Sequence, residues 1–154
     1  MSYFLILFAL VAIGAVIYLS KSKGKATSTV PALGGGIAKI RGNGRFEVDV
    51  VGESFYKDSF VELARRHKPT NADSESFGDA VLSLDDKNPH DRNAVAVHIE
   101  GLQVGHLSRS MAVDFRKAIA RDGLQQHRQF AVAARLYWGG DEGLRSVSLD
   151  LPQA

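Results

Sequence analysis

Hydrophobic and polar residues alternate over much of residues 46–151, and this period of two predicts β-strands with one buried face. A glycine after the third such stretch, Gly101, marks a tight hairpin. Many short strands separated by glycine turns favour a barrel or a sandwich over a βαβ sheet. We predict about six strands, at residues 46–50, 80–84, 95–99, 103–107, 130–138 and 147–151.

Two stretches have a helical period instead. Residues 59–62 read Ser-Phe-Val-Glu, which matches a capping box and predicts a short helix over about 59–67. A second helix begins at Ser108 or Ser110 and ends before Gly123, a residue suited to the left-handed position after a helix. Its apolar side chains lie on one stripe: Met111, Phe115, Ala118 and Ile119.

The start of the chain is hydrophobic without a polar face. Residues 3–19 carry no charge and, as a helix, would span roughly 25 Å, the short end of what crosses a hydrocarbon core of about 30 Å. Lysines 21, 23 and 25 follow, so we expect a single-pass helix in the inner (plasma) membrane with the C-terminal domain in the cytoplasm. A cleaved secretory signal is the alternative, but its positive charge would precede the apolar run.

Charge and composition limit what the remaining chain does. Residues 20–45, rich in Gly, Ser and Lys, are expected to form a flexible linker to a domain at 46–151. The chain has 19 basic and 17 acidic residues, but three lysines and no acids lie in residues 1–38, so residues 39–154 have one more acid than base. Any contact with nucleic acid must therefore be local. Because there is no cysteine, disulfides and thiolate metal sites are excluded.

The densest chemistry lies in residues 88–93, Asn-Pro-His-Asp-Arg-Asn, directly before a strand. Asn and Asp side chains hydrogen-bond to their own backbone and proline fixes one dihedral angle, so we expect a rigid turn. It gathers two amides, a carboxylate and an imidazole, a combination that suits a small polar ligand. Asp91 is equally suited to binding a ligand and to capping the turn. Asn93 favours a structural role, because a buried amide can tie the loop to the backbone. Among the five histidines, His90 is the best ligand candidate.

Metal sites and catalytic groups are not expected. Residues 86–88 begin like a calcium loop, but Pro89 and the missing glycine break the pattern. No histidine pair at helical spacing and no Walker motif is present. Asp85, Asp86 and Asp91 have the ligand type for Mg²⁺, but no general base or nucleophile stands beside them. We expect no cofactor, no metal and no enzyme activity, and a metal-dependent nuclease is the weakest hypothesis.

Three motifs, in order and spacing, resemble the HIRAN domain: residues 50–56 (Val-Val-Gly-Glu-Ser-Phe-Tyr), residues 88–97 (Asn-Pro-His-Asp-Arg-Asn-Ala-Val-Ala-Val) and residues 104–109 (Val-Gly-His-Leu-Ser-Arg). The resemblance covers about 46–151. It implies a modified OB-like β-barrel with two helices. In helicase-linked members this domain captures the 3′ end of single-stranded DNA, and other members are bacterial chains that often stand alone.

The resemblance also implies roles for single residues. Phe55 and Tyr56 match aromatic positions, although at least one of them is expected to pack in the core. Ser54 stands where DNA-binding members have a basic residue, which removes a phosphate contact. His90 replaces an aromatic residue and remains able to stack. Asp91 matches the acid that accepts a hydrogen bond from a terminal 3′ hydroxyl.

His106 and Arg109 match the polar and basic positions near the terminal phosphates, and Asn93 completes the expected ligand-binding set. Trp138 lies loosely near a further aromatic position, but it alternates with core residues and is expected to be buried. The leading hypothesis is a non-catalytic module that binds a nucleic-acid end and is tethered to a membrane. The alternative, motivated by the near-neutral domain and Ser54, is a membrane-anchored protein-interaction barrel without nucleic-acid binding.

Overall fold

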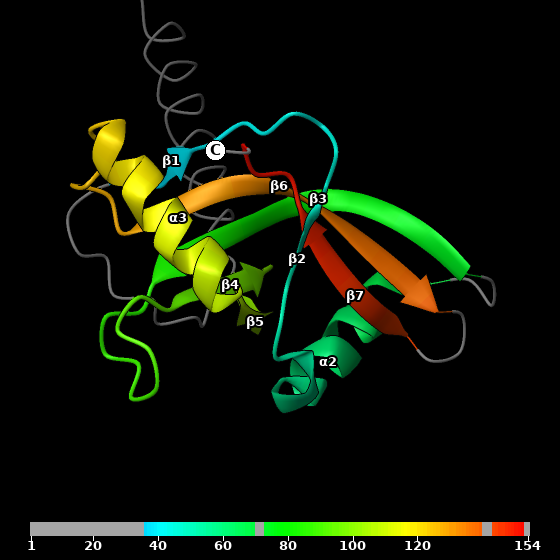
Figure 1. Ribbon diagram of the computed structural model, residues 1–154. Helices are drawn as coiled ribbons and strands as arrows, with labels where there is room; N and C mark the ends of the chain where they lie inside the picture. Colours follow the sequence, from blue (N-terminus) through cyan, green and yellow to red (C-terminus); the bar gives the residue numbers. More distant parts are fainter. Residues whose placement is uncertain (1–35, 70–72, 140–142, 153–154) are drawn as a thin grey trace, which may run out of the picture. The chain divides into compact units, whose positions relative to one another are not determined.

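The computed structural model describes residues 36–69, 73–139 and 143–152, which form one sheet with two helices (Figure 1). The predicted membrane helix at residues 3–19, and the predicted linker up to residue 35, lie outside this part of the chain. Within it, neither helix has the length and apolarity needed to cross a bilayer.

The sheet has the strand order β2-β7-β6-β3-β4-β5, and every neighbouring pair along this path is antiparallel. A further short strand, β1, pairs with β6 in parallel. The strands are β1 (Ala38–Lys39), β2 (Val48–Asp49), β3 (Asp73–Leu84), β4 (Val95–Ile99), β5 (Leu102–His106), β6 (Gln129–Gly139) and β7 (Leu144–Leu149). The helices are the 3₁₀ turn η1 (Glu53–Phe55), α2 (Lys57–His67) and α3 (Arg109–Arg121).

The two ends of the sheet are joined by the residues that follow β2. Val50 donates its N–H to Val147 of β7 at 3.0 Å, while Val51 and His106 of β5 exchange two backbone hydrogen bonds of 2.9 Å. One short segment therefore reaches both ends of the strand order, and the sheet is curled. The prediction of a mainly β, barrel-like fold with two helices is confirmed at this level.

Gly105 lies at this junction. A Cβ atom there would lie 2.5 Å from the Val50 Cγ1 atom and 2.5 Å from the Val51 carbonyl oxygen. Because the second of these atoms belongs to the backbone, no side-chain rotation relieves the clash. Glycine thus lets β5 approach the segment that closes the sheet.

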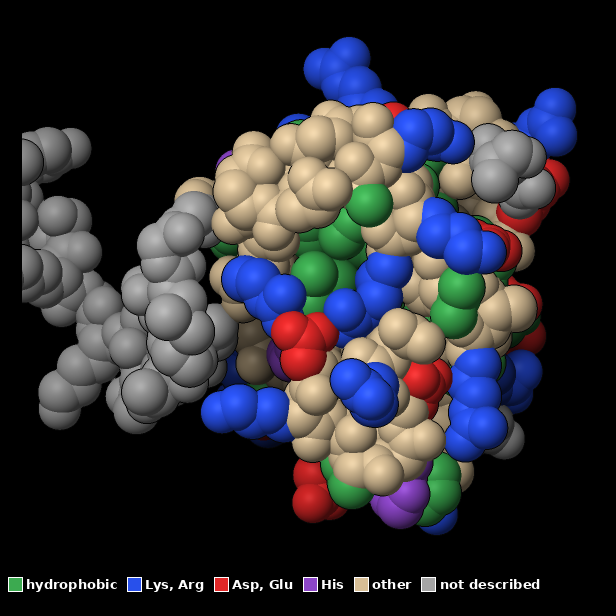
Figure 2. Space-filling model, turned by 60° about the vertical axis from the view of Figure 1, so that its left-hand side comes forward, with side chains coloured by type: hydrophobic (Ala, Val, Ile, Leu, Met, Phe, Trp, Pro, Cys, Tyr) green, Lys and Arg blue, Asp and Glu red, His purple; other side chains and the backbone are tan. Residues whose placement is uncertain are grey.

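The core lies between the sheet and α3. This helix crosses one end of the sheet and buries Ala112, Phe115 and Ile119 (Figure 1). The Phe115 ring meets that of Phe130 on β6 edge to face, with centroids 5.3 Å apart. The face that carries α3 shows hydrophobic side chains mainly in a recess, with charged side chains around it (Figure 2). By contrast, α2 buries only Leu63.

The ends of α3 agree with the sequence prediction. Ser108 is its N-cap, and the side chain accepts the Met111 N–H at 3.4 Å. At the other end, Leu124 donates to the carbonyl of Ile119 at 2.8 Å, and Gly123 has a φ angle of 68°. This pattern is a Schellman motif, which satisfies carbonyls that the helix leaves unpaired.

The predicted capping box of α2 is wrong. The helix begins at Lys57 rather than Ser59, and its N-cap, Tyr56, makes no side-chain cap hydrogen bond. The chain enters the helix directly from η1, so Ser59 already lies in the first turn. Glu62 therefore does not reach back to the N-terminus and instead pairs with Arg65 and Arg66 one turn later.

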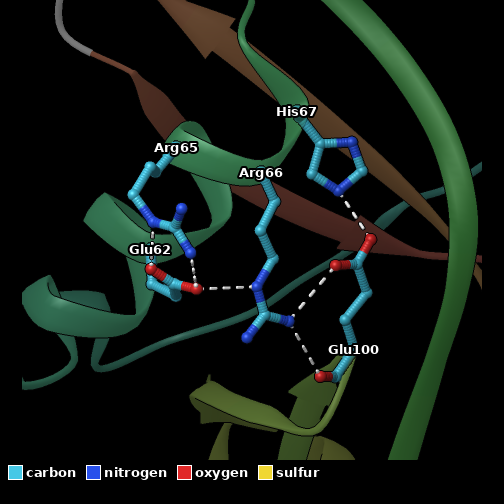
Figure 3. Close-up of polar contacts among 5 residues, drawn as sticks. All are labelled: Glu62, Arg65, Arg66, His67 and Glu100. Carbon is cyan, nitrogen blue, oxygen red and sulfur yellow. Dashed lines mark hydrogen bonds and ion pairs between the residues drawn. The ribbon is translucent and has the colours of Figure 1, made fainter. Parts of the chain in front are cut away.

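Charged residues join the end of α2 to the hairpin between β4 and β5 (Figure 3). Arg66 contacts Glu62 at 2.9 Å and the Glu100 carboxylate at 3.4 Å, and His67 lies 2.6 Å from the other oxygen of Glu100. The hairpin turn itself is confirmed, because Glu100 and Gly101 have φ angles of 50° and 82°, as a type I′ turn requires.

Strand β3 is the largest departure from the prediction. It begins at Asp73, whereas the sequence pattern predicted a strand from residue 80. It pairs with β6 from Asp73 opposite Gly139 to Ser83 opposite Gln129. Its first half is polar and mostly exposed, so no apolar alternation marks it, and pairing with β6 determines its structure.

Candidate nucleic-acid end site

A surface groove of about 600 Å³, here called the end-binding groove, lies where three segments far apart in the sequence meet. These segments are residues 51–56, the turn at 88–94, and residues 106–109 between β5 and α3. Six of the seven predicted ligand-binding residues line it: Phe55, Tyr56, His90, Asp91, His106 and Arg109. Val51, Gly52, Asn88, Ala94 and Leu107 complete the lining.

One wall of the groove is the polar turn. The Asn88 side-chain oxygen accepts the N–H groups of His90 at 3.0 Å and Asp91 at 3.2 Å. The Asn88 amide nitrogen donates to Asp85 at 3.1 Å. The prediction that Asn and Asp side chains bond to their own turn is thus confirmed. His90 itself is exposed at the surface of this wall.

Asp91 combines the two roles that the sequence left open. Its Oδ1 atom accepts the Asn93 N–H at 2.8 Å, so the carboxylate caps the turn. Its other oxygen has no hydrogen-bond partner among the described residues, and the side chain is only partly buried beside the groove. A ligand with a hydroxyl group therefore has an acceptor that folding does not use.

Asn93 does not line the groove. Its N–H bonds to Asp91, and its carbonyl accepts the Arg116 Nε–H at 2.8 Å. These contacts favour the structural reading of this residue. Its predicted part in ligand binding stays a prediction with no support from the geometry.

The opposite wall is aromatic. Phe55 is 86% exposed, and Tyr56 is half-buried, so the expectation that one of them packs in the core is wrong. Both residues lie where η1 passes into α2, outside the hydrophobic core. The Tyr56 ring lies 5.9 Å from that of His106, at 54° to it. Burial, followed by the charge of Asp85, raises the pKa of the Tyr56 hydroxyl.

Gln103 supports this wall, and the sequence analysis missed it. Its amide nitrogen donates to the Tyr56 hydroxyl at 2.9 Å and lies 3.3 Å from Nε2 of His106. Residues three apart in a regular strand lie on opposite faces, but Val104 is an extra residue opposite β4. This bulge brings Gln103 and His106 to the same face. A period-two pattern cannot indicate such a contact.

Among the described residues that line the groove, Arg109 is the only lysine or arginine. Arg109 is exposed and is the first residue of α3, and its side chain makes no ion pair or hydrogen bond with the described residues. The N-terminus of a helix favours anions because its N–H groups point outward. Ser54, at the position where DNA-binding members have a basic residue, is exposed and does not line the groove.

The acids proposed for a nuclease are not arranged for a metal. Asp86 pairs with Arg116 at 2.9 Å and also with Arg128. Burial raises the pKa of Asp86, but the hydrogen bonds from the two arginines outweigh it and lower the pKa. Among the described residues, no group of three metal-ligating side chains is found. Trp138 is buried as predicted, and its indole N–H donates to Ser76 at 2.8 Å.

Comparison with known families agrees with this geometry. The family model of the HIRAN domain matches residues 43–135, which include every residue of the groove lining. Comparisons with curated proteins and with solved structures gave no significant match.

Proposed function

The chain belongs to the HIRAN domain family, whose members are generally nucleic-acid-binding modules, and from this premise we propose that its groove binds the 3′ end of a single nucleic-acid strand. The free oxygen of Asp91 accepts a hydrogen bond from the terminal 3′ hydroxyl. Phe55, Tyr56 and His90 stack against the last bases. Arg109, with His106 beside it, contacts a phosphate.

The chemistry of these groups favours an end over an internal segment. A carboxylate accepts a hydrogen bond from a terminal hydroxyl, but it repels the phosphate that would continue the strand. Stacking on an aromatic side chain contributes roughly 1–3 kcal/mol per base without choosing a sequence. With one arginine and no cation at Ser54, we expect modest affinity with a shallow salt dependence.

One observation carries this proposal: an unused carboxylate oxygen, an exposed phenylalanine and an unpaired arginine line the same groove. A phenylalanine ring as exposed as Phe55 buries little apolar surface and therefore contributes little to folding. Folding alone does not explain Phe55 or Arg109, because Phe55 buries little and no ion pair or hydrogen bond of the Arg109 side chain with the described residues is found.

Fluorescence anisotropy of the full chain with labelled oligonucleotides tests the proposal. We expect a strand with a 3′ hydroxyl to bind about tenfold more tightly than the same strand with a 3′ phosphate, since one charge-assisted hydrogen bond is replaced by repulsion. Asp91→Asn should remove the preference, and Asp79→Asn, an exposed acid of β3, should keep it. Equal binding of both strands by the natural chain would reject hydroxyl recognition. Absence of binding at low salt would reject nucleic acid as the ligand.

We further propose that residues 3–19 tether the domain to the inner face of the plasma membrane. The support is the uncharged apolar stretch followed by three lysines. Alkaline extraction of membranes should leave the chain in the pellet, and added protease should cleave the domain only after the cells are opened. Release of the chain by alkali would reject the tether.

We propose that the module binds without catalysis. Asp86, which a nuclease would need, is already paired with two arginines. End-labelled DNA should therefore stay intact with the chain and Mg²⁺, and cleavage that depends on Mg²⁺ and is lost in Asp86→Asn would contradict this.

A protein-interaction barrel remains the second candidate. It is favoured by Ser54 at the position of a basic residue and by the excess of one acid over bases in residues 39–154. Pull-down from solubilised membranes, with and without nuclease, separates the two functions. A partner that survives nuclease treatment favours this candidate, and one that is lost favours nucleic-acid binding.

A further inference from the structure

A second groove, here called the α3 groove, shares no lining residue with the end-binding groove. It has a volume of about 580 Å³ and lies between α3 and the segment that follows β1. Its floor is apolar and includes Val48, Met111, Phe115 and Leu151. Nothing in the proposed function uses it.

A free strand edge borders this groove. Residues 39–41 line it, and the Ile40 N–H bonds to Ala131 of β6 at 2.9 Å. Backbone groups of a strand alternate between its two sides, so the N–H and C=O of Lys39 point away from β6. No hydrogen bond from the Lys39 backbone to another described residue is found. A free edge of this kind is where an extended peptide can add as a further strand.

The charges at the rim leave a positive excess. Arg121 pairs with Asp122 at 3.0 Å, and Asp114 pairs with Lys117 at 3.7 Å, so both acids of the rim are neutralised. Lys39 and Arg41 are exposed and make no ion pair with the described residues. Two cations therefore remain beside an apolar floor.

We propose that the α3 groove binds an extended peptide segment of a partner protein, which adds as a strand beside β1. Alternate apolar side chains of the peptide enter the groove, and the acidic side chains between them pair with Lys39 and Arg41. The three observations that carry this proposal are independent: an open strand edge, an apolar floor and an unpaired positive rim. A free fatty acid would fit the floor and the charge, but it would leave the strand edge unpaired.

Labelled peptides and the full chain test the proposal. The probe is a nonapeptide of alternating Val and Glu, and two controls replace Glu by Lys or carry N-methyl groups on every second residue. We expect the probe to bind, and each control to bind about tenfold more weakly, because one loses the ion pairs and the other the strand hydrogen bonds. Equal binding of the N-methylated peptide would overturn strand addition. Failure of all three peptides to bind would overturn the proposal.

Charge-reversal variants test where the peptide binds. Lys39→Glu with Arg41→Glu should weaken the probe about tenfold or more, while Arg45→Glu with Lys68→Glu, a pair of exposed cations outside both grooves, should not. Oligonucleotide binding should be unchanged in both variants, so a failure here is distinguishable from a failure of the end-binding function. Equal affinity of the two variants for the probe would overturn the assignment.

Since the chain has no cysteine, a single introduced cysteine gives a clean position test. Asp114→Cys at the rim should form a disulfide with a probe that carries one cysteine, in the presence of oxidised glutathione. Asp79→Cys, exposed on β3, should form much less. Equal trapping at the two positions would show that the peptide does not occupy the α3 groove.

Discussion

One wall of the end-binding groove is a polar turn that bonds to its own backbone, and the other is an aromatic segment held by distant residues. The three hydrogen bonds of Asn88 join residues no more than three apart in the sequence. Tyr56, in contrast, is held by Gln103, 47 residues away, and Val51 by His106. The polar wall is therefore encoded locally, whereas the aromatic wall exists only when the sheet has closed.

Because of this difference, substitutions in the two walls should affect stability and ligand binding to different extents. A change at Asn88 should act locally, because its three hydrogen bonds close within the loop. A change where the aromatic wall joins β5 should disturb the whole sheet. A change at the exposed end of the aromatic wall should alter only binding.

The largest effect is expected from Gly105→Ala, at the junction of β5 and the aromatic wall. The new methyl group would lie 2.5 Å from the Val51 carbonyl oxygen, so backbone must move. We expect a loss of about 3 kcal/mol in the free energy of unfolding, the upper part of the range for overpacking. Urea denaturation followed by the fluorescence of Trp138 measures it.

Gly78→Ala in β3 is the matched control for this prediction. Nothing lies within 4 Å of a Cβ atom at Gly78, so the free energy of unfolding should stay the same or rise slightly. If Gly105→Ala unfolds at the same urea concentration as this control, β5 and the aromatic wall are not joined as described.

Phe55→Ala should give the next largest effect, on binding alone. The ring is 86% exposed, so its removal should leave the free energy of unfolding unchanged. Loss of one stacked base should weaken oligonucleotide binding by roughly 1–3 kcal/mol. Fluorescence anisotropy measures the affinity. Phe77→Ala, which removes a ring 66% exposed on β3, should bind oligonucleotides normally, and equal losses in the two variants would contradict a stacking role for Phe55.

Asn88→Ala should have a smaller effect, shared by stability and binding. The variant removes the acceptor of two turn N–H groups and the donor to Asp85. We expect a loss of about 1 kcal/mol in the free energy of unfolding, because the loop is partly exposed and water replaces some of these bonds. Thermal unfolding measures it, and the preference for a 3′ hydroxyl should fall because Asp91 loses its position.

Asn93→Ala is the control for Asn88→Ala. Only the backbone of Asn93 makes the contacts described above, so its side chain should be dispensable for stability. If Asn93→Ala lowers the free energy of unfolding as much as Asn88→Ala does, the turn is not organised by the Asn88 side chain.

The sequence predicted those parts of the molecule whose hydrogen bonds and turns involve residues close together in the sequence. The turn at 88–93, the hairpin at Glu100 and Gly101, and both ends of α3 depend on residues within a few positions of one another. The residue types at these positions favour the required backbone angles directly. Gly123, for example, adopts the left-handed φ angle that follows the end of α3.

The parts that were missed depend on distant partners. The first half of β3 is polar and becomes a strand only against β6. Gln103 reaches Tyr56 and His106 because Val104 forms a bulge. The capping box at Ser59 failed because η1 feeds the chain into α2 two residues earlier. The resemblance to a family supplied the groove residues, since no period in the sequence brings residues 51–56 to the polar turn.

The smallest effect is expected from Glu62→Gln, which tests the charged support of α2 behind the aromatic wall. Hydrogen bonds from Arg65 and Arg66 lower the pKa of Glu62 to about 2. A carboxyl group whose folded pKa is depressed stabilises the fold above its unfolded pKa, near 4.5, and loses this contribution as the pH falls toward 2. The difference in Tm between the natural chain and the variant should therefore be positive at pH 6 and shrink between pH 4.5 and pH 2. Thermal unfolding across this range measures it, with Glu75→Gln as a surface control. A difference that does not change with pH would mean that α2 is held by its contact at Leu63 rather than by Glu62.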